Sequence, residues 1–112
     1  MNFTSKKPSK ITCTEDKVSV CLKVLGNKWT GLILTQLLDG SQRFTELERA
    51  LAGISPRTLS QRLDDLEEHG VITKKSFAEV PPRTEYTLTP KGRDFIPILN
   101  QMSAWGSKYP LA

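Results

Sequence analysis

The stretch SPRTLSQRLDDLEEHGVI, residues 55–72, carries the clearest structural signal in the chain. Ser55 followed by Pro56 is typical of the start of a helix, and Gly70 is typical of its end. Three leucines recur between them at helical spacing: Leu59, Leu63 and Leu66. The stretch therefore predicts an amphipathic helix that buries its leucines.

The charges of this helix run in an unusual order. Arg57 and Arg62 occupy its first half, whereas acids at positions 64, 65, 67 and 68 occupy its second half. A helix dipole favours the opposite arrangement by roughly 0.3–1 kcal/mol per well-placed charge. Backbone N–H groups, the positive end of the dipole and two arginines at one end of a helix all attract phosphate. The order therefore costs some stability and favours an anionic partner.

A short helix and a four-residue turn precede this stretch. Thr45 and Glu48 match a capping box, so a helix is expected to start at Thr45. Residues 52–55 follow as a turn that contains Gly53. A helix, a glycine-bearing turn and a longer helix form the helix-turn-helix pattern, in which the start of the second helix enters the major groove of DNA.

The side of the second helix that faces away from the leucines is expected to contact DNA. Arg57 and Gln61 lie opposite the leucines, and their side chains can pair bidentately with guanine and adenine. Four further residues are expected to contact the duplex: Ser55, Thr58, Ser60 and Arg62. For Arg62 the alternative is an ordinary surface ion pair with Asp65, three residues further on.

The flanking segments predict a mainly α chain with a small β-hairpin. Helices are expected over residues 15–25 and 28–38, and from Pro90 to about Trp105. The second of these is expected to carry one apolar stripe, made of Trp29, Leu32, Ile33, Gln36 and Leu37. Strands are expected over residues 71–77 and 84–88, joined by the proline-containing loop AEVPPR.

A hairpin directly after a helix-turn-helix is typical of a wing. Lys74 and Lys75 lie at its base and Arg83 at its tip, and all three are expected to contact DNA. The alternative is a solvated hairpin whose lysines protect an exposed strand edge.

Composition sets the limits of this interpretation. The 112 residues are expected to form a flexible basic arm, residues 1–12, and a single domain, residues 13–112. The arm carries three of the four net positive charges, so bulk charge alone does not establish nucleic-acid binding. The chain has no apolar run of the roughly 20 residues that a membrane helix needs, and no signal peptide is recognisable. A cytoplasmic protein without a membrane partner is expected.

Enzyme chemistry and metal binding are not expected. His69 is the sole histidine, and it does not form a zinc-binding pattern with the two cysteines. No phosphate-binding glycine loop and no nucleophile elbow occur in the sequence. We therefore expect neither a catalytic site nor a cofactor.

Four motifs carry a resemblance to a known family. They are LGNKWTGLIL (25–34), RFTELERAL (43–51), GISPRTLSQRLDDLEEHGVI (53–72) and EVPPRTEYTLTPKG (79–92). In this order they resemble the HxlR-type winged helix-turn-helix transcriptional regulators, relatives of the MarR group, over nearly all of residues 18–106. The resemblance implies a homodimer that binds pseudo-palindromic operator DNA through the second helix of the motif and the wing.

The resemblance also implies that the N- and C-terminal helices build the dimer. The apolar residues expected at that interface are Val18, Leu22, Leu25, Phe95, Ile98, Leu99, Met102 and Trp105. A purely intramolecular core is the alternative use of the same residues.

The signal to which such a regulator responds is open. Several family members sense oxidants through a cysteine near the N-terminus, and Cys13 lies in roughly that region. It follows a lysine-bearing arm and precedes a helix, and both features favour the reactive thiolate. The alternatives are an incidental cysteine and a small-ligand sensor with a pocket between the domain body and the terminal helices. A winged-helix module that binds another protein, without DNA, is the alternative to the whole interpretation.

Overall fold

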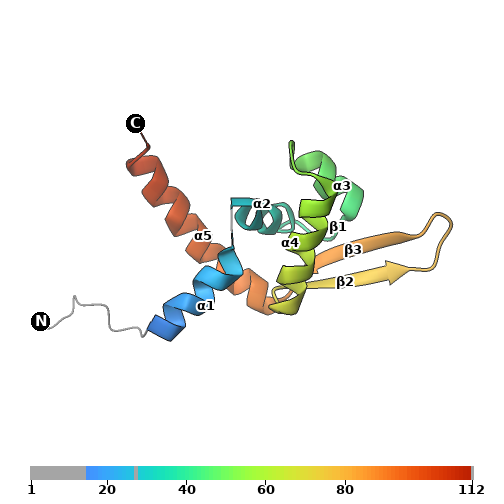
Figure 1. Ribbon diagram of the computed structural model, residues 1–112, viewed down its shortest axis with the longest axis horizontal. Helices are drawn as coiled ribbons and strands as arrows, with labels where there is room; N and C mark the ends of the chain where they lie inside the picture. The colour runs from blue at the N-terminus through green and yellow to red at the C-terminus, as the bar shows by residue number, and fades with distance from the viewer. Residues whose placement is uncertain (1–14, 27, 112) are drawn as a thin grey trace, which may run out of the picture.

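The computed structural model describes residues 15–26 and 28–111. This part of the chain is mainly helical with a small antiparallel sheet, which confirms the expected winged helix-turn-helix architecture (Figure 1). Its elements in chain order are α1 (Glu15–Leu25), α2 (Lys28–Gln36), β1 (Gln42–Arg43), α3 (Phe44–Ala50), α4 (Pro56–Glu68), β2 (Ile72–Phe77), β3 (Arg83–Leu88) and α5 (Pro90–Lys108).

The core lies where α2, α3 and α4 meet the base of the hairpin. The leucines of α4 are fully buried as expected, together with Leu47 of α3 and Ile72 of β2. The stripe predicted for α2 is partly wrong, because Leu32 is exposed whereas Leu34 is fully buried. The physical reason is a rotation of the helix, which turns Thr30 into the core beside Ile33.

Capping side chains set the starts of the longer helices. The Ser55 hydroxyl accepts a hydrogen bond from the Thr58 N–H at 3.0 Å, and the Thr89 hydroxyl accepts one from the Gly92 N–H at 3.0 Å. Each cap precedes a proline at the first helical position, where the missing N–H costs nothing. α4 and α5 therefore begin where the sequence predicts.

The start predicted for α3 is wrong. The helix begins at Phe44, and the Glu46 carboxylate accepts a hydrogen bond from the Arg43 N–H at 2.7 Å, so Thr45 and Glu48 do not form the cap. The reason is β1, which the sequence pattern does not predict. Because Arg43 pairs with Glu85 of β3, its backbone is extended and the helix can begin only after it.

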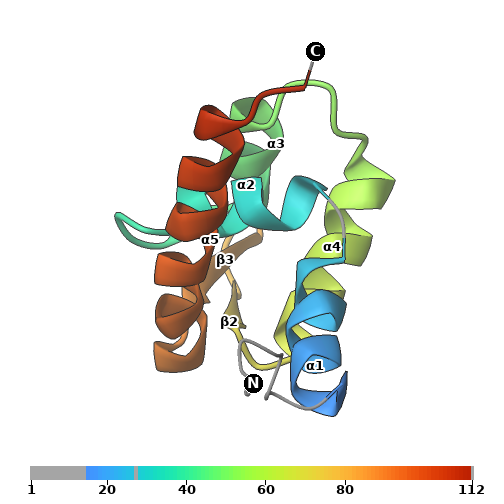
Figure 2. The same ribbon diagram turned by 90° about the vertical axis from the view of Figure 1, so that its left-hand side faces the viewer.

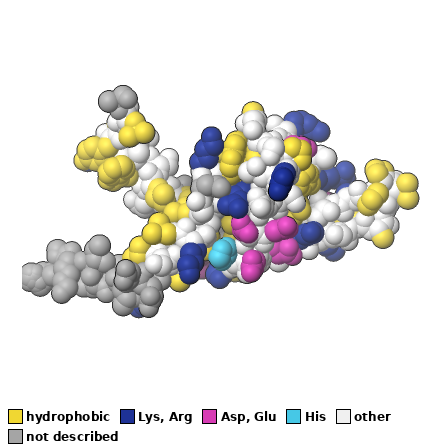
Figure 3. All heavy atoms as spheres, viewed as in Figure 1, with side chains coloured by type: hydrophobic (Ala, Val, Ile, Leu, Met, Phe, Trp, Pro, Cys, Tyr) yellow, Lys and Arg dark blue, Asp and Glu magenta, His cyan; other side chains and the backbone are white. Residues whose placement is uncertain are grey.

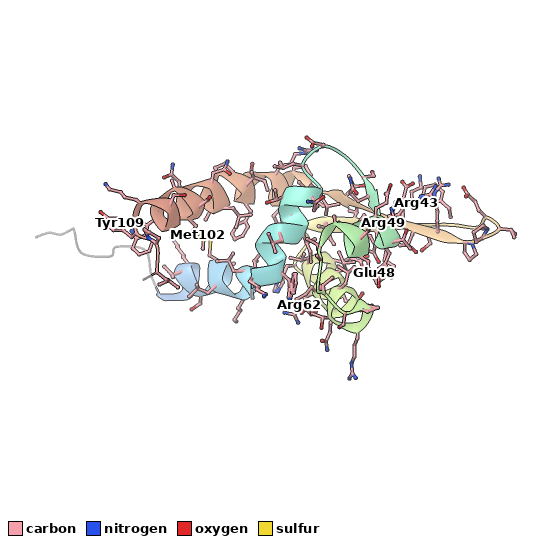
Figure 4. The ribbon with its side chains drawn as sticks, turned by 90° about the horizontal axis from the view of Figure 1, so that it is seen from above. Arg43, Glu48, Arg49, Arg62, Met102 and Tyr109 are labelled. Carbon is pink, nitrogen blue, oxygen red and sulfur yellow. The ribbon has the colours of Figure 1, made fainter. Side chains whose placement is uncertain are left out.

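The three strands pair in the order β1-β3-β2, and the register assigns the two faces of the hairpin. Lys74 pairs with Tyr86 on the face that continues into the core and packs against α4. Phe77 pairs with Arg83, and Lys75 pairs with Glu85, on the opposite face. α4 lies on one side of the sheet in two perpendicular views (Figures 1 and 4).

Hydrogen bonds hold together the corner where α4, β2 and α5 meet. α4 ends at a turn in which Gly70 has φ +76°. The Thr89 hydroxyl donates to the Gly70 carbonyl at 2.6 Å, and Lys91 Nζ donates to the His69 carbonyl at 2.7 Å. The first turns of α5 are thereby fastened at the end of α4, while its second half projects from the body (Figure 1). Figure 2 looks at the projecting side and shows α5 and α1 in front, with α2 between them.

Candidate nucleic-acid interface

The first two turns of α4 present exposed polar side chains. Arg57, Ser60 and Gln61 are all exposed, and within the described residues none of their side chains has a hydrogen bond or ion pair. Arg57 and Gln61 lie opposite the buried leucines, as expected. These three side chains are therefore available to a partner that approaches from outside.

Acidic side chains follow on the same helix. Asp64 and Glu68 continue the line of Arg57 and Gln61, and at 1.5 Å per residue Asp64 lies roughly 10 Å beyond Arg57. Figure 3 shows acidic side chains gathered over the lower end of α4, with basic side chains above them. The outer surface of α4 thus changes from positive to negative along its length.

The helix start has fewer free donors than expected. The Ser55 and Thr58 hydroxyls hydrogen-bond to each other at 2.9 Å, so both side chains take part in the cap. Pro56 has no N–H, and the N–H groups of Thr58 and Leu59 bond to Ser55. The Arg57 N–H is therefore the donor that this first turn leaves for an anion. Its guanidinium supplies most of the positive charge there.

Arg62 is held within the chain. Its guanidinium pairs with Asp65 at 2.7 Å, which is the alternative that the sequence left open. Nη1 lies 3.4 Å from the position that a Cβ on Gly26 would occupy, so the side chain lies against the turn between α1 and α2 (Figure 4). Arg62 thus lies between α4 and Gly26, and its guanidinium must leave Asp65 to reach a phosphate.

The wing lysines point to opposite faces of the hairpin. Lys74 is exposed on the α4 side, whereas Lys75 is exposed on the other side with its Nζ 5.2 Å from the centre of the Phe77 ring. A single duplex that lies along α4 can therefore contact Lys74 more directly than Lys75.

Arg83 is not the free cation that the sequence pattern indicates. Its Nη1 donates to both carboxylate oxygens of Glu79 at 2.7 Å, and its guanidinium carbon lies 4.0 Å from the centre of the Phe77 ring. Its Nε lies 3.1 Å from a carboxylate oxygen of Glu85, in an ion pair without hydrogen-bond geometry. The side chain is 25% exposed.

Two further features belong to the wing. Burial raises the pKa of Tyr86, and the nearby charges of Asp64 and Glu67 raise it further, which places this ring close to the acidic half of α4.

A groove of about 440 Å³ lies between the start of α3 and the wing loop, lined by residues 43–45, Glu79 and residues 81–84. This groove is not at the place expected for a ligand sensor, between the body and the terminal helices.

The terminal helices expose apolar side chains at their projecting parts. The exposed members of the expected set are Val18, Leu22, Ile98, Met102 and Trp105. Leu25 and Leu99 are partly buried against the core. The expectation that Phe95 lies at the dimer interface is wrong. Its side chain is only 7% exposed and packs in the core of this chain, so it has little area left for a partner.

The sequence interpretation missed Val20 and Tyr109, which extend the exposed set. The Tyr109 ring lies 5.3 Å from the Trp105 ring. Hydrophobic side chains gather on the projecting end of α5 in Figure 3, and Met102 points from α5 towards α1 in Figure 4.

The expected redox residue, Cys13, and the arm of residues 1–12 lie outside the described residues. Cys21 is partly buried and packs against the core. Among the described residues, no group of three His, Cys, Asp or Glu side chains is placed to hold a metal ion. Within residues 15–26 and 28–111, no helix is both long and apolar enough to span a membrane.

Known proteins share this sequence and architecture. The HxlR-like helix-turn-helix family matches residues 24–111. An uncharacterized HTH-type transcriptional regulator of Methanothermobacter thermautotrophicus is 44% identical over 82% of this chain and 70% of its own. The uncharacterized HTH-type transcriptional regulator YvaP of Bacillus subtilis is 46% identical over 77% of this chain and 80% of its own. The redox regulator HypR in its reduced form superimposes with a TM-score of 0.76 at 38% identity, covering 82% of this chain and 91% of HypR.

Proposed function

The chain belongs to the HxlR-like helix-turn-helix family of transcriptional regulators, and we propose that it binds operator DNA as a homodimer through the first turns of α4. The observation that supports this most is the exposure of Arg57 and Gln61 without partners on the outer side of that helix. A regulator of this class is not an enzyme, and its place of action is the cytoplasm, where the DNA is.

Base reading is assigned to Arg57 and Gln61. An arginine can donate two hydrogen bonds to the major-groove edge of guanine, and a glutamine can pair in the same bidentate manner with adenine. Each such contact discriminates against the wrong base by about 1–3 kcal/mol. Contacts to the DNA backbone are assigned to Ser60, which is exposed on α4, and to Lys74, which is exposed on the face of the hairpin that packs against α4.

The acids on α4 limit how the helix can enter the groove. Asp64 and Glu68 repel phosphate, so a pose that buries the whole length of α4 between the two strands is unfavourable. A helix that enters with its first two turns keeps these carboxylates away from the backbone. The charge order noted in the sequence is therefore consistent with end-on docking of α4.

The homodimer is supported by the apolar side chains at the projecting parts of α1 and α5. Leu22 is 60% exposed and Trp105 is 67% exposed, and Trp105 lies on the half of α5 that projects from the core. A second copy of the chain, related by a twofold axis, covers the same patch on both protomers. Two copies of α4 then reach two half-sites about one turn of DNA apart, or a multiple of it.

DNA binding is tested by gel shift with fragments of the source genome at increasing salt concentration. Wild type is expected to shift specific fragments, with an affinity that falls as salt rises. Arg57→Ala should weaken the shift roughly 5- to 150-fold, which corresponds to a loss of about 1–3 kcal/mol, whereas Arg93→Ala, at an exposed arginine of α5, should bind as wild type does. Failure of wild type to shift any fragment, with capture of a protein partner instead, would favour the protein-interaction module.

The dimer is tested by sedimentation equilibrium. Wild type should behave as a dimer at micromolar concentration. Trp105→Ala should weaken association at least tenfold, because a buried aromatic anchor contributes upwards of about 2 kcal/mol. A monomeric wild type, or a Trp105→Ala variant that associates equally well, would refute this use of α5.

A redox response is the second part of the proposal, and it is favoured by the likeness to the redox regulator HypR. We assign the response to Cys13, because Cys21 packs against the core. Diamide treatment should change the operator affinity of wild type and of Cys21→Ser, but not that of Cys13→Ser. An equal response of all three proteins, or of none, would contradict the assignment.

A further inference from the structure

We propose that Arg83 is a positioning residue that holds the wing in shape, and that it acts by binding its carboxylate partners rather than DNA. The inference rests on the proposed function, since the wing is useful only if it docks beside α4. It departs from the sequence expectation, in which Arg83 reaches the DNA as a free cation.

The geometry encloses the guanidinium on three sides. Glu79, in the loop between the strands, accepts two hydrogen bonds from Nη1 at 2.7 Å. Glu85, two residues further along β3, lies 3.1 Å from Nε. The Phe77 ring covers the guanidinium face at 4.0 Å from across the hairpin. One side chain thus joins the loop, β3 and the end of β2.

The face of the sheet on which this happens argues against direct DNA contact. Phe77, Arg83 and Glu85 share the face opposite α4, because cross-strand partners and alternate residues of a strand lie on one side. Lys74, Ser76 and Thr84 occupy the α4 side. The wing therefore presents one face to the duplex, while the clamp formed by Glu79, Arg83, Glu85 and Phe77 ties its strands and loop together from behind.

The charges of the clamp also argue for a positioning role. Two carboxylates already pair with this one guanidinium, so a phosphate would have to displace Glu79 to reach Arg83. A two-stranded hairpin is marginally stable on its own, and this one projects beyond the core (Figure 1). Ordering the loop before binding lowers the entropy lost on docking.

The two roles of Arg83 predict opposite effects of Glu79→Gln. If Arg83 positions the wing, the substitution loosens the loop and operator affinity falls about two- to fivefold. If Arg83 binds phosphate, the substitution frees the guanidinium and removes a repulsive charge, and affinity rises. Arg83→Gln distinguishes the two roles in a second way, through the slope of log affinity against log salt concentration. Loss of a phosphate contact reduces the size of this slope by about one, whereas loss of a positioning residue leaves it unchanged.

The experiment combines amide hydrogen exchange of the full chain without DNA and titration of a duplex selected by wild type. Glu79→Gln and Arg83→Gln should speed exchange in residues 77–84 about three- to tenfold, with no change in α2 or α4. The control Glu68→Gln removes one exposed acid of α4, which has no ion pair within the described residues, and should leave wing exchange unchanged. Unchanged exchange, tighter binding by Glu79→Gln or a reduced slope for Arg83→Gln would each overturn the inference. Failure of wild type to bind any duplex would refute the proposed function, and the exchange measurement would still decide whether the clamp orders the wing.

Discussion

Gly92 is the position where the structure predicts the sharpest effect of a single methyl group. It is the third residue of α5 and is buried against the corner between α4 and β2. A Cβ at this position would lie 2.1 Å from the Val71 carbonyl oxygen and 3.1 Å from Cδ2 of Leu88. The Val71 carbonyl cannot simply turn away, because it also accepts a hydrogen bond from the Thr89 N–H at 3.1 Å.

The magnitude follows from two opposing effects. Replacing glycine by alanine within a helix ordinarily stabilises a protein by roughly 0.5–1 kcal/mol. Real Cβ contacts are essentially never shorter than 3.0 Å, so α5 and the Val71 backbone must separate by about 0.9 Å. Overpacking of this kind costs about 1–3 kcal/mol, and more where backbone must move. We therefore expect Gly92→Ala to destabilise the protein by about 1–2 kcal/mol, which lowers Tm by roughly 5–15 °C.

The assay is thermal and urea unfolding followed by circular dichroism at one fixed protein concentration. Gly31→Ala is the matched control, since its Cβ would meet only Cδ2 of Leu99, at an ordinary 3.7 Å. It should leave stability unchanged or raise it by up to about 1 kcal/mol. A Gly92→Ala protein as stable as Gly31→Ala would show that α5 does not approach Val71 this closely. The arrangement of the projecting helix relative to α4 would then be wrong.

Two smaller effects follow from the same structure. Ser55→Ala should destabilise the protein by about 0.5–2 kcal/mol, because it removes the cap of α4, whereas Ser60→Ala on the exposed side should change unfolding by less than about 0.5 kcal/mol; equal effects would refute the cap. Folding raises the pKa of Tyr86, so its contribution to stability is present below the ordinary tyrosine pKa of 10.0 and is lost as pH rises through the raised value. As pH rises above 10, the free energy of unfolding of Tyr86→Phe should therefore fall less than that of wild type. If urea titrations show the same fall for both proteins, the raised pKa is contradicted.

The parts of the fold that the sequence predicts are those with local signals. Ser55, Pro56 and Gly70 define α4 because a cap, a fixed φ and a left-handed turn act within a few residues. β1 could not be predicted in this way, since two residues show no periodicity and the strand exists only through its pairing with β3. The same pairing moves the start of α3 to Phe44 and overrides the local match at Thr45 and Glu48.

The features of the candidate site also divide into those that the sequence predicts and those that depend on tertiary packing. The exposure of Arg57 and Gln61 follows from helical geometry and the positions of three leucines. The opposite directions of Lys74 and Lys75 could also have been predicted, because neighbouring residues of a strand alternate between faces. The sequence offered Asp65 as a partner of Arg62 but could not decide between that ion pair and a free side chain, and it did not indicate the partners of Arg83, because rotamer and tertiary packing decide which acid an arginine pairs with.

The most direct test of the account is a base-by-base measurement of recognition by Arg57. Duplexes are first selected from a random pool by wild type, and affinities of wild type and Arg57→Ala are then measured for every single-base variant of the selected half-site. Wild type should lose about 1–3 kcal/mol at a guanine that Arg57→Ala no longer distinguishes, with the other positions and the Arg93→Ala control unaffected. An Arg57→Ala protein that keeps the full wild-type pattern of preferences would contradict the claim that the first turns of α4 read DNA.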